Sequence, residues 1–526
     1  MNQLNLIKAL AFAPLIALFS LSSQAADLTQ VKVEQGLLKG KTQNNLTVFK
    51  GIPFAKPPVG KLRWQAPQPA ENWDGVKQAQ DYAPACIQAG NPPSGISEDC
   101  LYLNIWAPAK SADENIPVFV WIYGGGFSFG TSSDPIFDGR HLAKKGVIVV
   151  TIAYRVGQLG FLAHPQLSQE SKNGVSGNYG LLDQIEALKW IKHNIASFGG
   201  DPNKVTIAGE SAGGISVSML AASPVAKGLF HGAISQSGGS FGPDRKQGYP
   251  GENMILLEQA EQEGTAYVKQ LGASSINELR KMDAKKFIPA GWSLPGGWPI
   301  VDGYVIADDQ YKLYQKGQYN DVPVLVGYNS DEGASFVWNN NPKQFIEGVK
   351  KRFGPYAKDL LAAYPTSNDK ITRMGRNLIR DAAFGWHTWS WAKLQSETGQ
   401  SPAYLYYFDQ HPEHKKGSDK YNYGSPHGQD IAYVFQHLDS TNPDINQNDL
   451  RLADAISSYW ANFTKTGNPN GKKLPKWPAY NSDSQKVMYF QQTPKLGPVA
   501  DKASLEVLDK YFEWRRTDEG RKWANQ

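Results

Sequence analysis

The chain has 526 residues, of which 41% are hydrophobic, 12% aromatic and 20% charged, a mixture that excludes a disordered or collagen-like chain. Lysine and arginine number 54 and aspartate and glutamate 49, so the formal charge of +5 is small for this length and argues against a dedicated nucleic-acid binder. No uninterrupted apolar run approaches twenty residues, which excludes a protein that spans a membrane several times.

The N-terminal 25 residues are interpreted as a secretory signal peptide. Lys8 precedes the apolar stretch 9–21, and Ser23 and Ala25 supply the small side chains expected before a cleavage site. A membrane anchor is the alternative, but this stretch is too short for a helix to cross about 30 Å of hydrocarbon. We therefore expect an exported protein, periplasmic or extracellular, whose mature chain forms a single domain over residues 26–526.

The chain contains two cysteines, Cys86 and Cys100. In an oxidising compartment they can form one intrachain disulfide, which would close a loop and stabilise the fold by about 3 kcal/mol. Metal binding by these two thiols is the weaker alternative, because no cluster of cysteine and histidine surrounds them in the sequence.

Short apolar runs alternate with amphipathic stretches along the chain. Residues 28–48 indicate an antiparallel hairpin with a polar face. Buried strands are predicted at 117–123, 146–154, 205–208 and 322–327, and helices at 180–198 and 215–222. Because continuous apolar strands alternate with helices, we expect a mostly parallel sheet covered by helices, the α/β class. Polar stretches at about 241–300 and 409–423 are interpreted as loop-rich insertions near the functional face.

The pattern Gly-x-Ser-x-Gly occurs three times, around Ser128, Ser211 and Ser240. Such a serine is a nucleophile when it stands on a sharp, strained turn between a strand and a helix. Ser211 alone follows a predicted strand and precedes a predicted helix. Ser211 is therefore the predicted nucleophile, with a structural turn serine as the alternative.

A serine hydroxyl is a weak nucleophile and needs a base, which an acid orients. The expected chain order is serine, then aspartate or glutamate, then histidine. His427 is favoured as the base because glycines flank its loop, whereas the other later histidines lie in helix-like or charged surroundings: His231, His387, His411, His414 and His437. Asp331 and Glu332 follow a predicted strand and compete evenly as the acid, with a capping or surface carboxylate as the alternative for each.

A glycine-rich loop, Gly124 to Gly126, ends the strand predicted at 117–123. Such a loop can supply backbone N–H groups to an oxyanion hole, together with the N–H of the residue after the nucleophile, Ala212. The alternative is a turn that needs glycine only for its positive φ angles.

From about residue 31 to 480 the chain resembles the type B carboxylesterases, the cholinesterase-like branch of the α/β-hydrolases. The resemblance rests on the serine turn and on ordered motifs at 49–55 (FKGIPFA), 97–105 (SEDCLYLNI), 154–157 (YRVG), 198–202 (FGGDP) and 329–333 (NSDEG). It implies an α/β-hydrolase fold with large insertions around an active-site gorge. It also implies an exported bacterial serine esterase that uses neither a metal nor an organic cofactor.

The resemblance assigns roles residue by residue. It places the acid on Glu332, the base on His427, the oxyanion donors on Gly125, Gly126 and Ala212, the disulfide on Cys86 and Cys100, and two supporting groups near the histidine on Glu210 and Ser237. In cholinesterases the loop closed by this disulfide is longer and carries a tryptophan for the choline ammonium. Here residues 87–99 contain no aromatic side chain. We therefore expect neutral short-chain or aryl esters as substrates, unless Trp292, Trp298 or Trp386 supplies a substitute ring.

We thus expect an enzyme that hydrolyses small-molecule carboxylic esters through an acyl-enzyme, without a nucleic-acid partner or stable membrane insertion. The oligomeric state is not predicted. An amide or carbamate hydrolase or a lipase on the same triad is the alternative, because pocket shape decides the substrate. A non-catalytic adhesion protein of the same fold is disfavoured, because the chain retains all three triad residues.

Overall fold

The computed structural model describes residues 28–288, 297–337, 341–364, 371–412, 416–418, 420 and 422–526. The predicted signal peptide, Trp292 and His414 lie outside the described residues. Among the residues that the structure describes, none of the helices combines the length and the apolar composition needed to cross a membrane.

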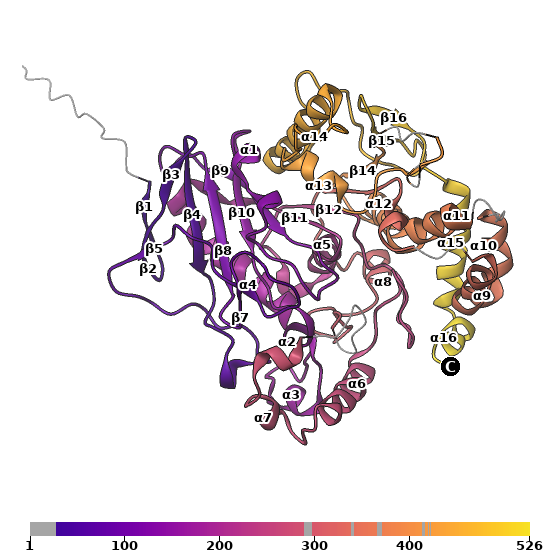
Figure 1. Ribbon diagram of the computed structural model, residues 1–526, viewed down its shortest axis with the longest axis horizontal. Helices are drawn as coiled ribbons and strands as arrows, with labels where there is room; N and C mark the ends of the chain where they lie inside the picture. The colour runs from indigo at the N-terminus through magenta and orange to yellow at the C-terminus, as the bar shows by residue number, and fades with distance from the viewer. Residues whose placement is uncertain are drawn as a thin grey trace, which may run out of the picture.

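A sheet of eleven strands forms the centre of the molecule (Figure 1). In spatial order the strands are β16 (Lys495–Gly497), β15 (Val487–Phe490), β14 (Ala403–Phe408), β13 (Val324–Asn329), β12 (Gly232–Gln236), β11 (Gly200–Glu210), β9 (Ile116–Ile122), β10 (Ile148–Ile152), β8 (Tyr102–Ala107), β4 (Leu46–Pro53) and β3 (Lys41–Gln43). The strands from β15 to β10 pair in parallel, and both edges are antiparallel. Every residue of β10, β12, β13 and β14 is buried, as the continuous apolar runs predict. The mostly parallel α/β architecture is therefore confirmed.

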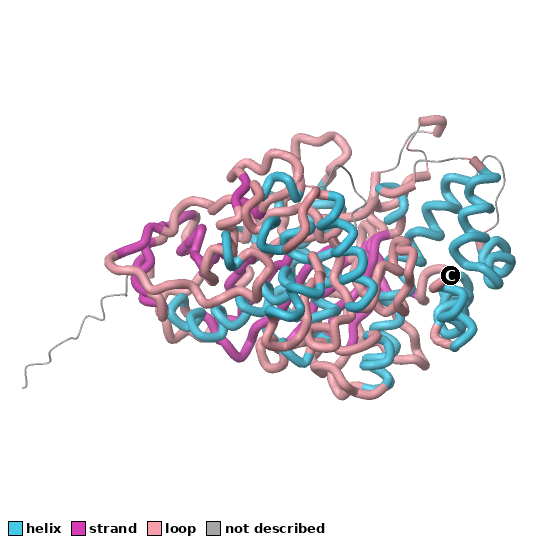
Figure 2. The backbone as a smooth tube through the Cα atoms, turned by 90° about the horizontal axis from the view of Figure 1, so that it is seen from below, coloured by secondary structure: helices cyan, strands magenta, loops and turns pink. Residues whose placement is uncertain are grey.

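Helices α4, α5, α12 and α14 pack against this sheet. The helices of the described chain are α1 (Arg140–Ala143), α2 (Gly157–Phe161), α3 (Pro165–Glu170), α4 (Tyr179–Asn194), α5 (Ala212–Ala222), α6 (Leu257–Gln270), α7 (Ile276–Leu279), α8 (Gln310–Gln315), α9 (Pro342–Phe353), α10 (Ala357–Ala363), α11 (Ile371–Arg380), α12 (Trp386–Thr398), α13 (Gln429–Val434), α14 (Gln447–Thr466), α15 (Lys502–Arg515) and α16 (Asp518–Ala524). Figures 1 and 2 show α9, α10, α15 and α16 gathered at the end of the molecule where the chain terminates.

Several predicted elements differ in extent from the observed ones. The strand predicted at 205–208 is the longer β11, and the helix predicted at 215–222 begins earlier, at Ala212. The loop-rich prediction for 241–300 is wrong over α6, whose 14 residues are helical. The predicted N-terminal hairpin is two hairpins, because β1 (Gln30–Val33) pairs with β2 (Gly36–Lys39), and β3 pairs with β4 in the main sheet. A further strand, β5 (Val76–Gln78), joins β2.

A buried cluster of charges ties the C-terminal helices to the segment before α6. The carboxylate of Glu252 accepts hydrogen bonds from Arg245 (3.1 Å), Arg352 (3.0 Å) and Arg515 (2.6 Å). Burial opposes ionisation, but the three guanidinium groups outweigh it and hold the pKa of Glu252 below its usual value. A buried carboxylate is tolerated here because several cations and hydrogen-bond donors surround it.

Candidate active site

Ser211 stands on the turn between β11 and α5. Its backbone angles, φ 56° and ψ −124°, lie in a region that a residue with a Cβ rarely adopts. The turn is so tight that a Cβ on Gly213 would lie 2.0 Å from the carbonyl oxygen of Ile122. The N–H of Ser211 donates to the carbonyl of Gln236 at 2.9 Å, which holds the turn against β12. The predicted strand–serine–helix geometry is therefore observed.

His427 and Glu332 lie in contact, although 95 residues separate them. Glu332 begins the short turn after β13, and His427 lies in the loop before α13. The Nδ1 atom of His427 lies 2.5 Å from Oε2 of Glu332. The other carboxylate oxygen, Oε1, accepts hydrogen bonds from the hydroxyl of Ser237 at 2.5 Å and from the backbone N–H of Asn329 at 2.6 Å. Glu332 is thus held on both oxygens and can orient the imidazole.

The neighbouring Asp331 points to a different set of partners. Its carboxylate lies 3.1 Å from Arg373 and 3.0 Å from Arg376, both on α11, and it accepts the N–H of Gly424 at 3.0 Å. Asp331 therefore fastens the turn after β13 to α11, while Glu332 faces His427. The two candidates that the residues alone leave equal are distinguished by this geometry.

Glu210 precedes Ser211 and approaches the other side of the same histidine. Its Oε1 lies 3.2 Å from Nε2 of His427, which brings the imidazole to the serine turn. Burial raises the pKa of Glu210 to about 8, although the charge of His427 opposes this shift. Burial lowers the pKa of His427, but Glu210 and Glu332 outweigh this effect and raise it to about 9. Within the described residues, the polar contacts of the His427 ring are with Glu332 and Glu210, and no hydrogen bond joins it to the hydroxyl of Ser211.

The glycine loop lies beside the nucleophile. A Cβ on Gly124 would lie 2.8 Å from the carbonyl oxygen of Glu210 and 3.1 Å from Cβ of Ser211. Gly125 and Gly126 follow with φ angles of 103° and 57°, which favour glycine. Ala212 is the first residue of α5, and the first N–H groups of a helix have no partner within that helix. Gly124 therefore borders Ser211, and two of the predicted oxyanion donors, Gly125 and Gly126, follow it directly in the loop, while the third, Ala212, follows the serine.

Two hollows share this glycine loop as part of their walls. The larger, of about 910 Å³, is lined by Gly125, Gly126, Trp298 and residues of the 246–270 segment. The smaller, of about 380 Å³, is lined by Gly124, Glu210, Tyr123, Phe129, Phe137 and the disulfide loop from Gln88 to Pro93. Aromatic rings thus reach the smaller hollow from other segments. Of the tryptophans considered as substitutes, Trp298 lines the larger hollow, and Trp386 is buried against Phe512.

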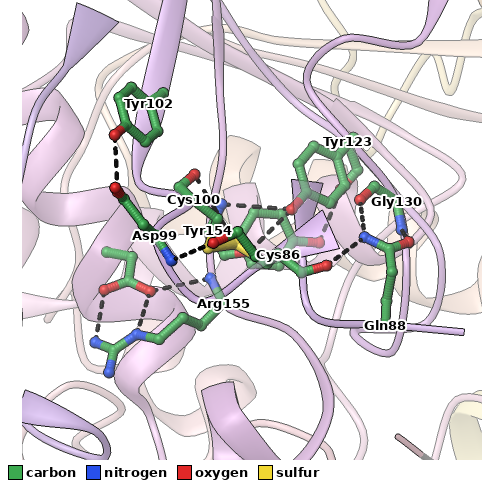
Figure 3. Close-up of a disulfide and its surroundings, with 11 residues drawn as sticks. Cys86, Gln88, Asp99, Cys100, Tyr102, Tyr123, Gly130, Tyr154 and Arg155 are labelled. Carbon is green, nitrogen blue, oxygen red and sulfur yellow. Dashed lines mark hydrogen bonds and ion pairs between the residues drawn. A yellow bond between two sulfur atoms is a disulfide. The ribbon is translucent and has the colours of Figure 1, made fainter. Parts of the chain in front are cut away.

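The disulfide between Cys86 and Cys100 is present, as the cysteine count predicts (Figure 3). Cys86 ends the short strand β6 (Ala85–Cys86), which pairs with β7 (Ile96–Ser97) inside the closed loop. Cys100 lies two residues before β8 of the central sheet. The disulfide therefore fixes one wall of the smaller hollow to the sheet.

Three residues that sequence reasoning missed surround His427. Phe336 and Phe384 pack against its ring, with centroids 5.0 and 4.7 Å away. Phe384 belongs to a π-helical turn, Asp381–Gly385, between α11 and α12, and such turns are frequent at functional sites. Asp430 is fully buried one turn after the histidine, and burial raises its pKa. No local pattern distinguishes these side chains from ordinary core residues.

The rejected candidates lie in other surroundings. Ser128 is half-buried in the glycine loop, and Ser240 is buried in the loop after β12; neither precedes a helix. Of the described histidines after Ser211, His427 is the one that contacts Glu332. The others bind elsewhere: His231 accepts the N–H of Val205, His387 accepts the N–H of Phe241, His411 pairs with Asp409, and His437 contacts the carbonyl of Asp138.

Known proteins of the same kind match almost the whole chain. A model of the carboxylesterase family matches residues 27–508. The fumonisin B1 esterase of Sphingopyxis macrogoltabida is 37% identical, covering 87% of this chain and 86% of its own. The para-nitrobenzyl esterase of Bacillus subtilis (strain 168) is 34% identical, covering 87% and 94%. A solved structure titled PNB esterase has a TM-score of 0.79 and 34% identity, covering 91% of this chain and 100% of its own. The chain therefore belongs to the carboxylesterase family and is a carboxylic ester hydrolase.

Proposed function

We propose that Ser211, His427 and Glu332 carry out this hydrolysis through an acyl-enzyme. Ser211 attacks the ester carbonyl while neutral His427 accepts its proton. The imidazolium then protonates the leaving alcohol, and Glu332 orients the ring and stabilises its charge. Water, activated by the same histidine, cleaves the acyl-enzyme and regenerates the serine.

The N–H groups of Gly125, Gly126 and Ala212 stabilise the tetrahedral oxyanion in this proposal. Preorganised donors of this kind contribute a large share of the rate enhancement in acyl transfer. The observation that carries the proposal is the contact of Glu332 with His427, whose other nitrogen reaches the carboxyl beside Ser211.

The proposed substrates are neutral esters with a short acyl chain or an aryl group, acted on after export. The disulfide loop brings no ring to the smaller hollow, although Phe129 enters it from the glycine loop. A quaternary ammonium entering this hollow therefore lacks the aromatic face that a ring on the disulfide loop would supply. We expect phenyl acetate to be hydrolysed with a higher kcat/KM than acetylcholine, and the reverse order would contradict this substrate class.

The triad is tested by substitution at each position. Ser211→Ala should remove nearly all turnover and abolish labelling by a fluorophosphonate probe, since the probe reacts with the activated serine. His427→Ala and Glu332→Gln should lower kcat strongly without unfolding the protein. Ser128→Ala and Ser240→Ala are the matched controls. Full activity of Ser211→Ala, or labelling lost only in Ser240→Ala, would disprove the assignment.

A further inference from the structure

The side-chain amide of Gln88 joins the disulfide loop to the glycine loop. Its Nε2 donates to the carbonyl of Gly130 at 2.7 Å and to that of Cys86 at 3.0 Å. Its Oε1 accepts the N–H of Gly130 at 2.8 Å. Figure 3 shows this paired contact beside the disulfide. The side chain is 3% exposed, so its hydrogen bonds are sheltered from competing water.

Gly130 closes the loop that presents the predicted oxyanion donors. The N–H groups of Ser128 and Phe129 donate to the carbonyl of Gly125 at 3.0 and 3.2 Å, so the loop folds back on itself. A Cβ on Gly125 would lie 2.2 Å from the carbonyl oxygen of Phe129, which shows how closely the two ends approach. A displacement of residues 129 and 130 must therefore move Gly125.

The other end of the linkage is fixed to the sheet. Cys100 precedes β8, and the disulfide holds Cys86 beside it. Gln88 follows Cys86 by two residues, and its amide also binds the carbonyl of Cys86. A continuous path of covalent and hydrogen bonds therefore runs from the central sheet through the disulfide and Gln88 to Gly130.

We propose that Gln88 is a positioning residue that holds the oxyanion loop in its active geometry, and that the disulfide acts on catalysis through this amide. The inference rests on the proposed function, because it requires the N–H groups of Gly125 and Gly126 to bind the oxyanion. Gln88 touches no reacting atom in this scheme. Its effect is to keep the donors preorganised, which is what makes them effective in the transition state.

Gln88→Met is the informative substitution, because methionine has similar length but cannot replace the amide hydrogen bonds. Loss of one well-placed oxyanion donor lowers kcat about 10²- to 10³-fold. A loop that is loosened, with its donors still present, should lose part of that factor. We expect kcat for phenyl acetate to fall roughly ten- to a hundredfold while KM stays within about threefold.

A transition-state analogue separates positioning from a purely structural role. A trifluoromethyl ketone forms a tetrahedral oxyanion on the serine, so its Ki should rise by the same factor by which kcat/KM falls. Gln395→Met is the matched control, because this buried glutamine donates to Asp321, which precedes β13 at the end of that strand opposite Glu332. It should leave kcat and Ki within about twofold. Gln88→Met with unchanged kcat, or with an unchanged Ki, overturns the inference.

The role of the disulfide is tested in a cycle with Cys86→Ala/Cys100→Ala. If the disulfide acts through Gln88, the variant that combines Gln88→Met with both cysteine substitutions should lose no more kcat than the worse of the two variants it combines. Losses that multiply would show independent effects and refute the path. Gln88→Glu retains the acceptor for the N–H of Gly130 but places a carboxylate oxygen against the carbonyls of Gly130 and Cys86. It should therefore lose at least as much kcat as Gln88→Met, and wild-type kcat there contradicts the proposal. An active Ser211→Ala would instead disprove the proposed function itself.

Discussion

The pair formed by Glu210 and His427 predicts an unusual dependence of activity on pH. The mechanism needs neutral imidazole, whose unperturbed pKa is about 6.5. Here the pKa of His427 is raised to about 9, so the imidazolium persists at higher pH and activity is lost as pH falls through that value. We expect kcat/KM for phenyl acetate to rise between about pH 7 and 9. This acid limb of the pH profile should have the slope of a single ionisation.

Glu210→Gln should move this limb to lower pH. Two unit charges 3.2 Å apart interact by about 5 kcal/mol at an effective dielectric constant of about 20, which sets a ceiling of about 4 pKa units. The pKa of Glu210 is itself about 8, so its charge develops only as the pair begins to titrate. The expected shift of the limb is therefore smaller, about one to three units downwards.

The measurement is a profile of kcat/KM between pH 5 and 10 for the wild type and the variant, from initial rates corrected for spontaneous hydrolysis. Glu347→Gln removes an exposed carboxylate on α9 and serves as the control, which should leave the limb in place. An acid limb of Glu210→Gln that stays fixed or moves upwards would refute the coupling between Glu210 and His427.

Three further substitutions test packing and charge. Glu252→Gln should lower the free energy of unfolding in urea by about 3–5 kcal/mol, because it leaves three buried arginines without their carboxylate, while exposed Glu258→Gln should change little. Because the pKa of Glu252 is lowered, its contribution is present above about pH 4.3 and should fade below it, so equal acid sensitivity of wild type and Glu252→Gln would count against the cluster. Gly124→Ala should reduce kcat at least about tenfold, since its Cβ would press on the backbone beside Ser211, and unchanged kcat would show that the loop can yield. Gly348→Ala, at an open position within α9, should stabilise the protein by about 1 kcal/mol, and a lower melting temperature would contradict the open space found there.

Local patterns were sufficient to predict the nucleophile turn, because its strand, its serine and its helix are consecutive in the sequence. Glycine is required near Ser211 because the turn leaves no room for a side chain, as the close approach of Gly213 to Ile122 shows. The parallel sheet was predictable for a similar reason, since each strand shows its burial in its own composition. What local patterns miss is the extent of elements such as β11 and α6.

The choice between Asp331 and Glu332 shows what local patterns cannot decide. Both residues follow β13 and both are buried. The difference arises from α11, whose residues Arg373 and Arg376 bind Asp331 from more than 40 positions away in the chain. The resemblance to the family favours Glu332, and in the structure Glu332 is the one of the two that contacts His427.

Phe384 and Asp430 were missed because their importance depends on tertiary contacts. Phe384 reaches the imidazole through a π-helical turn that ordinary helical periodicity does not reveal. Asp430 looks in the sequence like a residue of a short amphipathic helix. Its carboxylate instead accepts hydrogen bonds from Gln236 and Tyr406, both at 2.9 Å.

Three carboxyl groups thus approach one imidazole, and their hydrogen-bond donors separate their roles. Glu332 accepts from a hydroxyl and a backbone N–H on one oxygen and faces Nδ1 of His427 with the other, the arrangement expected of the orienting acid. Asp430 has uncharged donors, and burial raises its pKa. Glu210 faces Nε2, the nitrogen that accepts the serine proton in the proposed mechanism, and burial raises its pKa. In the proposed mechanism His427 therefore keeps a fixed partner at Nδ1, while its Nε2 first accepts and then returns the proton.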